Sequence, residues 1–128
     1  MADEPSNCFL CNPGRRPIIA QNALAFALND AHPVTPFHAL IIPRRHAPTY
    51  FDLHAPERRA IDLLLDEVRR NVLTADTTVE GFNIGMNCGR TAGQSVMHCH
   101  VHLIPRRAGD VDQPRGGVRA VIPGRAAY

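Results

Sequence analysis

The clearest pattern along the chain is an apolar stripe with helical period between residues 56 and 73. Charged side chains take most other positions of this segment, and Pro56 suits the first position of a helix because its missing N–H would have no partner there. The pattern predicts one long amphipathic helix that covers a core. The residues of the stripe lie at i, i+3, i+4, i+7 and i+11: Ile61, Leu64, Leu65, Val68 and Val72.

Short apolar runs on both sides of this helix predict strands. Pro, Gly, Asn and Asp residues bound these runs and interrupt regular structure. Strands that precede and follow a single long helix indicate an α+β fold, in which the helix covers an antiparallel sheet. Segments 8–17 and 108–128 are rich in Pro and Gly and are expected to be irregular. The predicted strands are residues 23–28, 37–42, 81–86 and 96–104.

The composition is that of an ordinary globular chain. Its 128 residues suit a single domain, 1–128, with 45% hydrophobic residues, 20% charged residues and a formal net charge of +2. No apolar run approaches the roughly 18 residues of a membrane span, and residues 1–5 lack the pattern of a signal peptide. We therefore expect a cytoplasmic protein with no membrane or nucleic-acid partner. In that reducing compartment its four cysteines are expected to be thiols or metal ligands.

His98, His100 and His102 occupy alternate positions of the chain. On a regular strand such residues share a face, so the spacing predicts three imidazoles on one surface. Packing alone accounts poorly for such a row. A zinc site made by all three is disfavoured, because residues i and i+2 of a strand stand about 6.6 Å apart. The favoured interpretation is a nucleophilic imidazole, flanked by histidines that orient it and bind charge.

The residues just before the histidines suit phosphoryl transfer. Ser95 supplies a hydroxyl, Gln94 an amide, and Gly93 a backbone that a phosphate can approach closely. A neutral imidazole can attack phosphorus, expel one part of the substrate and carry the other part until water releases it. This covalent route divides one difficult displacement into two easier ones. Donors such as Ser95, Gln94 and His102 would stabilise the charged oxygens of the transition state.

Three blocks of this sequence resemble the histidine triad (HIT) family of nucleotide hydrolases and transferases. Residues 98–104 match its His-x-His-x-His-x-x signature with apolar x, and residues 93–96 match the Gly-Gln-Ser/Thr-Val that precedes it. Residues 37–46 resemble the family block Gly-His-x-Leu-Val-Ile-Pro-Lys-x-His, with Phe37 in place of the usual glycine. The resemblance covers about residues 8–107. It implies a HIT-like fold, with an antiparallel sheet of about five strands and one long helix, and usually a homodimer with its sheets joined edge to edge.

The resemblance also implies a role for each matching residue. His100 would be the nucleophile, the backbone carbonyl of His98 would fix its tautomer, and His102 would contact phosphate oxygens. Ser95 and Gln94 would hold the phosphate and the leaving group. The residues expected to bind the nucleotide are Phe26, Leu28 and Ile42 as nucleobase walls, Asp30 on the ribose hydroxyls, His38 on the nucleotide side, and Asn87 and Gly93 at the phosphate.

Cys8 and Cys11 form a C-x2-C pair, which by itself is compatible with zinc, with a redox pair or with unrelated thiols. Bacterial HIT proteins with this pair take their other two ligands from the histidine that ends the second block and from the first triad histidine. Here these are His46 and His98. The resemblance therefore implies a structural Zn²⁺ that fixes the N-terminal segment to the catalytic strand.

The sequence predicts a nucleotide hydrolase similar to the fragile-histidine-triad branch, because a Pro-Arg pair follows the triad there as at Pro105 and Arg106. The expected substrate is a phosphoanhydride such as a dinucleoside polyphosphate, cleaved through a covalent nucleotidyl-histidine intermediate. Two alternatives stay open: a nucleoside phosphoramidate hydrolase or nucleotidyl transferase, and a non-catalytic nucleotide-binding protein. Arg106 and Arg107 have two open interpretations as well, contact with a polyphosphate or partner subunit, or ordinary surface arginines.

Overall fold

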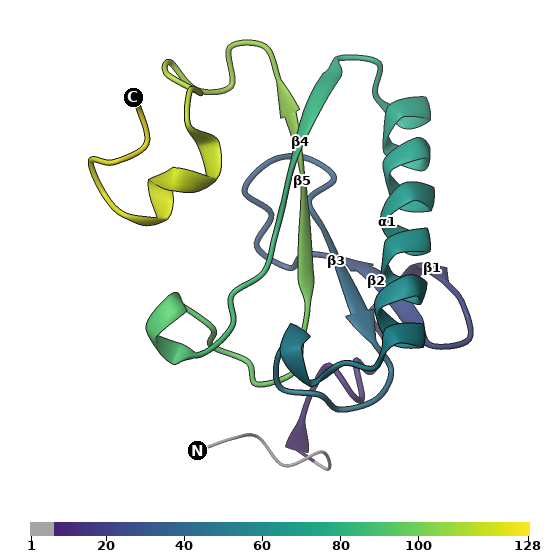
Figure 1. Cartoon of the computed structure of the whole chain (residues 1–128). Helices are drawn as coiled ribbons and strands as arrows, with labels where there is room; N and C mark the ends of the chain where they lie inside the picture. Colours follow the sequence, from purple (N-terminus) through teal and green to yellow (C-terminus); the bar gives the residue numbers. More distant parts are fainter. Residues whose placement is uncertain (1–6) are drawn as a thin grey trace.

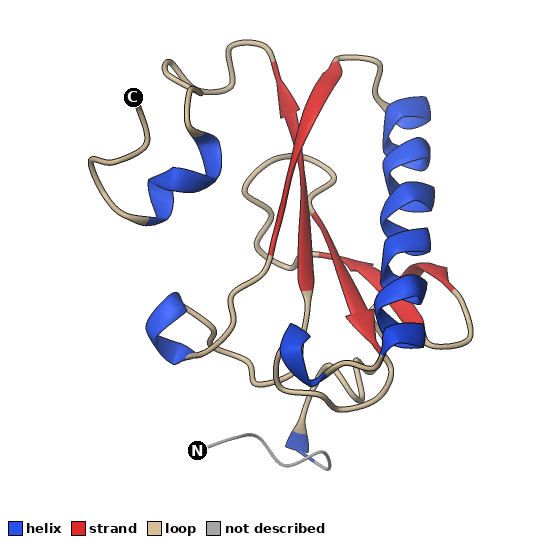
Figure 2. Cartoon of the chain, viewed as in Figure 1, coloured by secondary structure: helices blue, strands red, loops and turns tan. Residues whose placement is uncertain are grey.

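Five antiparallel strands form one sheet, and one long helix packs on a single face of it (Figures 1 and 2). The computed structural model describes residues 7–128, and the strand order is β1-β2-β3-β5-β4. This arrangement confirms the expected α+β class. The strands are β1 Ile18–Gln21, β2 Ala25–Asn29, β3 Ala39–Pro43, β4 Val79–Gly85 and β5 Val101–Arg107. The helices are α1 Ala55–Ala75 and the short 3-10 turns η2 Tyr50–Asp52, η3 Arg90–Ala92 and η4 Gly117–Val121.

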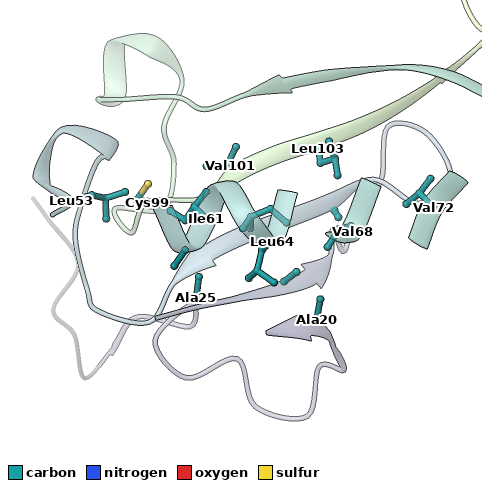
Figure 3. Packing of buried hydrophobic residues seen from close by; sticks show 14 of the residues in the cluster. Ala20, Ala25, Leu53, Ile61, Leu64, Val68, Val72, Cys99, Val101 and Leu103 are labelled. Atoms are coloured by element: carbon teal, nitrogen blue, oxygen red, sulfur yellow. The ribbon is translucent and has the colours of Figure 1, made fainter. Parts of the chain in front are cut away.

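The main core lies between α1 and the sheet. Because side chains alternate along a strand, every second residue of β2, β3 and β5 points towards the helix. Ile61, Leu64 and Val68 of the predicted stripe meet Val101 and Leu103 of β5 there (Figure 3). All five of these side chains are buried, so the apolar stripe stabilises the packing of α1 on the sheet.

The other face of the sheet carries a second apolar cluster. Phe26 and Leu28 of β2 and Leu40 and Ile42 of β3 pack there beneath Leu10 of the N-terminal segment. The same face continues onto β5, where His102 pairs with Leu40 in the β3–β5 register. The N-terminal segment and the histidines therefore lie on the face of the sheet that α1 does not cover.

The strand predicted for residues 96–104 begins later than the sequence pattern indicated. The chain bends at residues 96–98, and β5 starts at Val101, so only His102 of the triad lies on the strand. The N–H of Cys99 donates to the carbonyl oxygen of Ala47 at 2.7 Å instead of joining a strand ladder. The expectation that three imidazoles share one face of a regular strand is therefore wrong.

Two further features differ from the sequence analysis. β1 lies at residues 18–21, a run outside the predicted strands. Phe37, where the resembling block has glycine, adopts a left-handed backbone conformation with φ of +70°. That conformation is sterically costly for a residue with a Cβ. This cost is the reason why glycine suits the position, where the chain turns into β3.

An ion pair connects the start of α1 to the loop that follows β3. Nε and Nη2 of Arg45 donate to the carboxylate of the buried Glu57, at 2.9 and 2.8 Å. The same carboxylate accepts the N–H of His54 at 2.8 Å, which caps the first turn of the helix. The helix thereby positions the loop that carries His46. Within residues 7–128 no helix is long and apolar enough to cross a membrane.

Candidate active site and metal centre

Four side chains from three separate segments converge in a cluster that fits a tetrahedral metal site. The ligand atoms of Cys8, Cys11, His46 and His98 all lie within 4.8 Å of one another. Sγ of Cys8 lies 3.3 Å and Sγ of Cys11 lies 3.4 Å from Nδ1 of His98. Zinc bonds of about 2.3 Å to sulfur and about 2.0 Å to nitrogen place neighbouring S and N ligands about 3.5 Å apart. The donor set and its spacing therefore fit Zn²⁺.

The hydrogen bonding of His98 gives this ring the tautomer that a metal ligand needs. Its Nε2 lies 2.7 Å from the carbonyl oxygen of Pro43, which only accepts, so Nε2 carries the hydrogen. Nδ1 is then unprotonated and faces the two thiols. Burial lowers the pKa of His98 and keeps the ring neutral, as coordination requires.

The thiol of Cys11 lies in surroundings that disfavour its thiolate form. Burial, followed by the hydrogen bond and charge of Cys8, raises the pKa of Cys11 to about 11. A bound cation reverses this effect because it stabilises both thiolates. The four donors therefore suit a bound cation.

His100, two residues after His98, is oriented by the peptide between them. Its Nδ1 lies 2.8 Å from the backbone carbonyl oxygen of His98, so Nδ1 carries the hydrogen and Nε2 has a free lone pair. This is the contact that the family resemblance implied. The ring centroid of His100 lies 5.3 Å from that of His102, so the two imidazoles are neighbours.

His102 belongs to a hydrogen-bonded chain that begins at a backbone amide. The N–H of Val34 donates to Nδ1 of His38 at 3.1 Å, which leaves the hydrogen of that ring on Nε2. Nε2 of His38 then donates to Nδ1 of His102 at 2.9 Å. The remaining hydrogen of His102 lies on its Nε2, where it is available to a ligand oxygen.

Asp30 faces the same two rings. Its Oδ2 lies 3.5 Å from Nε2 of His38 and 3.9 Å from Nδ1 of His102. Burial lowers the pKa of both histidines, and the nearby charge of Asp30 opposes this shift only partly. The pair is therefore neutral at pH 7, and His102 is a hydrogen-bond donor rather than a fixed cation.

The loop between β4 and the triad carries the expected polar residues Asn87, Gly93 and Ser95. Gly93 has a φ of +98°, which a glycine adopts without strain, and it lies beside the side chain of Asn87. Ser95 is exposed, so its hydroxyl is accessible to a substrate. Asn87 also lines the cavity beside His102.

Gln94, in contrast, is buried and bonded to backbone atoms. Its amide nitrogen donates to the carbonyl oxygens of Pro48 and Val96, at 2.6 and 3.0 Å, and its Oε1 accepts from the N–H of Gly89. These bonds use the donors and the acceptor of the side chain to hold the loop. A direct contact of Gln94 with phosphate stays a prediction, and this geometry favours an indirect role.

The three expected nucleobase walls lie under the N-terminal segment. Phe26, Leu28 and Ile42 are nearly fully buried in the cluster beneath Leu10, and they do not line the cavity beside His102. Their role towards a nucleobase stays a prediction. A nucleobase at this place would have to displace Leu10.

Arg106 and Arg107 are both engaged within the chain. Arg106 makes two 2.8 Å contacts with the carboxylate of Asp110 and one of 2.7 Å with Oδ1 of Asn83. Arg107 contacts Asp76, at the end of α1, at 2.9 Å. These pairs favour a structural role for both arginines over a direct grip on polyphosphate.

The fold and this arrangement of histidines define a class of nucleotide-processing proteins, and comparison with known proteins gives the family. The profile of the HIT domain matches residues 15–109. This chain therefore belongs to the histidine triad family. A HIT-like protein of Mycoplasma pneumoniae is 33% identical over 105 residues, which are 79% of this chain and 72% of that protein.

Relatives with named activities match a smaller part of their own length. The bis(5'-adenosyl)-triphosphatase of Dictyostelium discoideum is 37% identical over 90 residues, 70% of this chain and 59% of that protein. The bifunctional bis(5'-adenosyl)-triphosphatase/adenylylsulfatase of Arabidopsis thaliana is 31% identical over 98 residues, 77% of this chain and 54% of that protein. This chain thus spans little more than half of each of these enzymes.

Solved structures share the fold. A HIT family protein from Bacillus anthracis superposes with a TM-score of 0.75 at 30% identity, over 84% of this chain and 77% of that chain. A Zn-bound histidine triad family protein from Mycobacterium smegmatis superposes with a TM-score of 0.74 at 28% identity, over 84% of this chain and 80% of that chain. The zinc in the latter structure is consistent with the donor cluster described above.

Proposed function

We propose that this protein is a nucleotide hydrolase that cleaves a phosphoanhydride, such as that of a dinucleoside polyphosphate, through a nucleotidyl intermediate on His100. The observation that carries the proposal is the bond from Nδ1 of His100 to the carbonyl of His98, which leaves the Nε2 lone pair free beside His102. Relatives named as bis(5'-adenosyl)-triphosphatases support the choice of substrate.

The reaction follows from these positions in two displacements. The Nε2 lone pair of His100 attacks the α-phosphorus, and the bond from phosphorus to the bridging oxygen breaks, so the leaving phosphate carries away the electron pair. The carbonyl of His98 holds the Nδ1–H while positive charge develops on the ring. Water then attacks phosphorus, and the bond from phosphorus to Nε2 breaks and returns its electron pair to His100. The nucleoside monophosphate leaves, and the proton of the attacking water passes to solvent.

The surrounding donors stabilise the charged oxygens during both steps. Nε2–H of His102 and the hydroxyl of Ser95 donate to them, while Gly93 allows close approach of its backbone. Asn87 lines the same pocket, and Asp30 and His38 face the nucleotide side. We infer that Gln94 acts by holding this loop in place.

We also propose that Cys8, Cys11, His46 and His98 hold a structural Zn²⁺. When bound, the ion supplies no reacting group; it fixes the N-terminal segment to the residues that precede β5. The spacing of the four donors and the tautomer of His98 support this assignment.

We further propose a cytoplasmic homodimer, as the family resemblance implies. β4 is an edge strand of the sheet, and Ile84 on it is half exposed, which supports association at this edge. Sedimentation of the wild type should give a dimer, and Ile84→Lys should shift it towards monomer. A monomeric wild type at all concentrations tested contradicts this proposal.

One experiment tests the catalytic proposal. The protein is incubated with diadenosine triphosphate, diadenosine tetraphosphate and adenosine 5'-phosphoramidate, while turnover and the intact mass of the protein are measured. We expect turnover and an adenylylated species, and His100→Ala should lose both. His32→Ala, a change at an exposed histidine, is the control and should keep both. A wild type inert towards all three substrates favours a non-catalytic nucleotide-binding protein, and turnover of the phosphoramidate alone favours the phosphoramidate hydrolase.

A further inference from the structure

The peptide unit between His98 and Cys99 is hydrogen-bonded on both of its sides. Its carbonyl oxygen, on His98, accepts from Nδ1 of His100 at 2.8 Å. Its N–H, on Cys99, donates to the carbonyl oxygen of Ala47 at 2.7 Å. A trans peptide unit is planar, with its C=O and N–H in opposite directions, so the bond to Ala47 also fixes the direction of the carbonyl that orients His100. The carbonyl of Ala47 therefore acts on the proposed nucleophile through one rigid unit.

The segment that carries Ala47 supplies two further acceptors to the residues before β5. The carbonyl oxygen of Pro43 lies 2.7 Å from Nε2 of His98, and that of Pro48 accepts from the amide nitrogen of Gln94 at 2.6 Å. Pro43 is the last residue of β3, so the sheet fixes its position. Ala47 and Pro48 lie beyond the strand, where the sheet no longer holds the backbone. Their position therefore depends on other contacts.

Arg45 closes the chain around Ala47 and Pro48. Its Nη2 donates to the carbonyl oxygen of Asp52 at 2.9 Å, so one side chain joins the two ends of the stretch that contains them. Nε and Nη2 of Arg45 also donate to the carboxylate of Glu57 on α1. Such a bond, with two donors on one carboxylate, has a defined geometry as well as charge assistance. The closed loop is thereby attached to the helix.

The two neighbours of Arg45 bond to other parts of the molecule. The guanidinium of Arg44 donates to Oε1 of Gln21 at 2.7 Å, next to β2. Nδ1 of His46 lies 3.3 Å from Sγ of Cys11, in the proposed metal cluster. Of these three consecutive side chains, Arg45 is the one that bonds to α1 within residues 7–128.

Loss of this attachment has a defined chemical consequence. When the carbonyl of Ala47 moves, the peptide unit between residues 98 and 99 turns, and Nδ1 of His100 loses its acceptor. A ring without that partner exchanges between its two neutral tautomers. In the form with its hydrogen on Nε2, this atom has no lone pair with which to attack phosphorus. The fraction of molecules ready to react therefore falls.

We propose that Arg45, paired with Glu57, is a positioning residue for His100, because it holds the loop whose Ala47 carbonyl fixes the peptide unit between residues 98 and 99. The effect on turnover rests on the proposed hydrolase function. Neither Arg45 nor Glu57 lines the cavity beside His102. Their loss should consequently lower kcat and spare substrate binding.

Steady-state kinetics with diadenosine tetraphosphate test this role. Arg45→Gln is expected to lower kcat about tenfold and to leave KM within roughly twofold, because a displacement of about 1 Å near a reacting group has effects of this size or larger. Glu57→Gln should show the same split. Arg45→Lys keeps the charge but not the planar pair of donors, so its kcat should lie between those of the wild type and Arg45→Gln.

Arg70→Gln is the matched control. It removes an exposed arginine of α1 from its ion pair with Asp66, far along the helix from Glu57, and should keep both kinetic constants. The melting temperature and zinc content of each variant are measured first, so that only folded proteins of equal metal content are compared. If Arg45→Gln does not fold, Arg45→Lys is compared with the wild type in its place.

A second measurement reports the hydrogen on the ring and requires no activity. Long-range 1H–15N NMR at pH 8, where histidine rings are neutral, gives the tautomer of His100. We expect the Nδ1–H form in the wild type and in Arg70→Gln, and an additional Nε2–H form in Arg45→Gln and, to a smaller extent, in Arg45→Lys.

The positioning role is overturned by a His100 tautomer that is the same in all variants. It is equally overturned by an unchanged kcat in Arg45→Gln, by a loss that falls on KM, or by the same loss in Arg70→Gln. A wild type that does not turn over the substrate means that the proposed function itself has failed. The tautomer of His100 then decides alone whether Arg45 positions this ring.

Discussion

His38 donates a hydrogen bond from Nε2 to Nδ1 of His102 across 2.9 Å. The direction of this bond is set outside the pair, because the N–H of Val34 occupies Nδ1 of His38. His102 consequently presents an N–H, not a lone pair, to the cavity. The backbone amide of Val34, a residue with no reactive side chain, thus determines that His102 presents a hydrogen-bond donor to a substrate.

The titration of His102 tests the electrostatic part of this arrangement. Burial lowers the pKa of His102 below its ordinary 6.5, and the charge of Asp30 counteracts that effect. We expect NMR titration to find a pKa below 6.5, and Asp30→Asn should lower it further. Asp112→Asn, at an exposed carboxylate, should leave it unchanged. A pKa of His102 at or above 6.5 contradicts the neutral pair.

The same shift has a consequence for stability. A histidine whose pKa is lower in the folded than in the unfolded state binds fewer protons when folded, so its contribution opposes folding as the pH falls below 6.5. In Asp30→Asn the loss of unfolding free energy should begin at the same pH and become larger, because the pKa of His102 falls further. Urea midpoints between pH 7 and pH 5 measure it.

Removal of zinc from its four proposed ligands should destabilise the fold. A ligand that binds only the folded state stabilises it by about 4 kcal/mol at a free concentration a thousandfold above its dissociation constant. We expect a chelator to lower the melting temperature of the wild type, and Cys8→Ser to bind less zinc and respond little to the chelator. Cys88→Ser, at a thiol outside the cluster, should keep both the metal and the response. Equal zinc content in the wild type and Cys8→Ser would falsify the assignment of these ligands.

Glu57 should stabilise the protein in a pH-dependent way. The hydrogen bonds from Arg45 lower the pKa of this carboxyl to about 2. Its contribution is therefore complete above the unfolded pKa near 4.5 and is lost as the pH falls towards 2. Glu57→Gln should reduce the free energy of unfolding by about 1–2 kcal/mol at pH 7.

Urea unfolding at pH 7, 4 and 3 checks this prediction. The difference between the wild type and Glu57→Gln should shrink steadily towards pH 3. Glu67→Gln, at an exposed position on the same helix, should differ little from the wild type at any pH. A difference that is constant with pH would show that the carboxylate charge does not contribute.

Phe37 should be the rare position where glycine stabilises the protein. A left-handed backbone costs a residue with a Cβ about 1–2 kcal/mol, whereas glycine loses about 0.4–1 kcal/mol through its more flexible unfolded state. We expect Phe37→Gly to be more stable than Phe37→Ala by about 1 kcal/mol, since alanine keeps the strain. Thermal melts of both variants measure this difference, and equal stabilities would contradict the strained turn.

The sequence predicted α1 closely, as residues 56–73 against the observed 55–75. Apolar residues at helical period can share one buried face only when the segment is a helix, and four of the five residues of the stripe are buried. The start of β5 was predicted wrongly for an equally physical reason. Alternation of histidine and apolar residues continues through residues 98–100, but His98 turns towards the cysteines and the Cys99 amide bonds to Ala47. Such contacts join residues far apart in sequence and leave no local pattern.

Parts of the site were similarly beyond sequence reasoning. The contact of Val34 with His38 uses a backbone amide, so the residue type carries no signal. Gln94 looked like a phosphate ligand because an amide suits either role, and only its burial shows that it bonds to the loop. The family resemblance did predict the convergence of Cys8, Cys11, His46 and His98.

His98 contacts two neighbours through different atoms. Its ring faces the cysteines, and its backbone carbonyl oxygen accepts a hydrogen bond from His100. Every amino acid has that carbonyl. The orientation of His100 therefore does not depend on the identity of side chain 98, and a lineage that lost Cys8 and Cys11 could replace this histidine without surrendering the alignment of His100. The proposed metal centre and the proposed nucleophile both depend on residue 98, yet they are free to evolve separately.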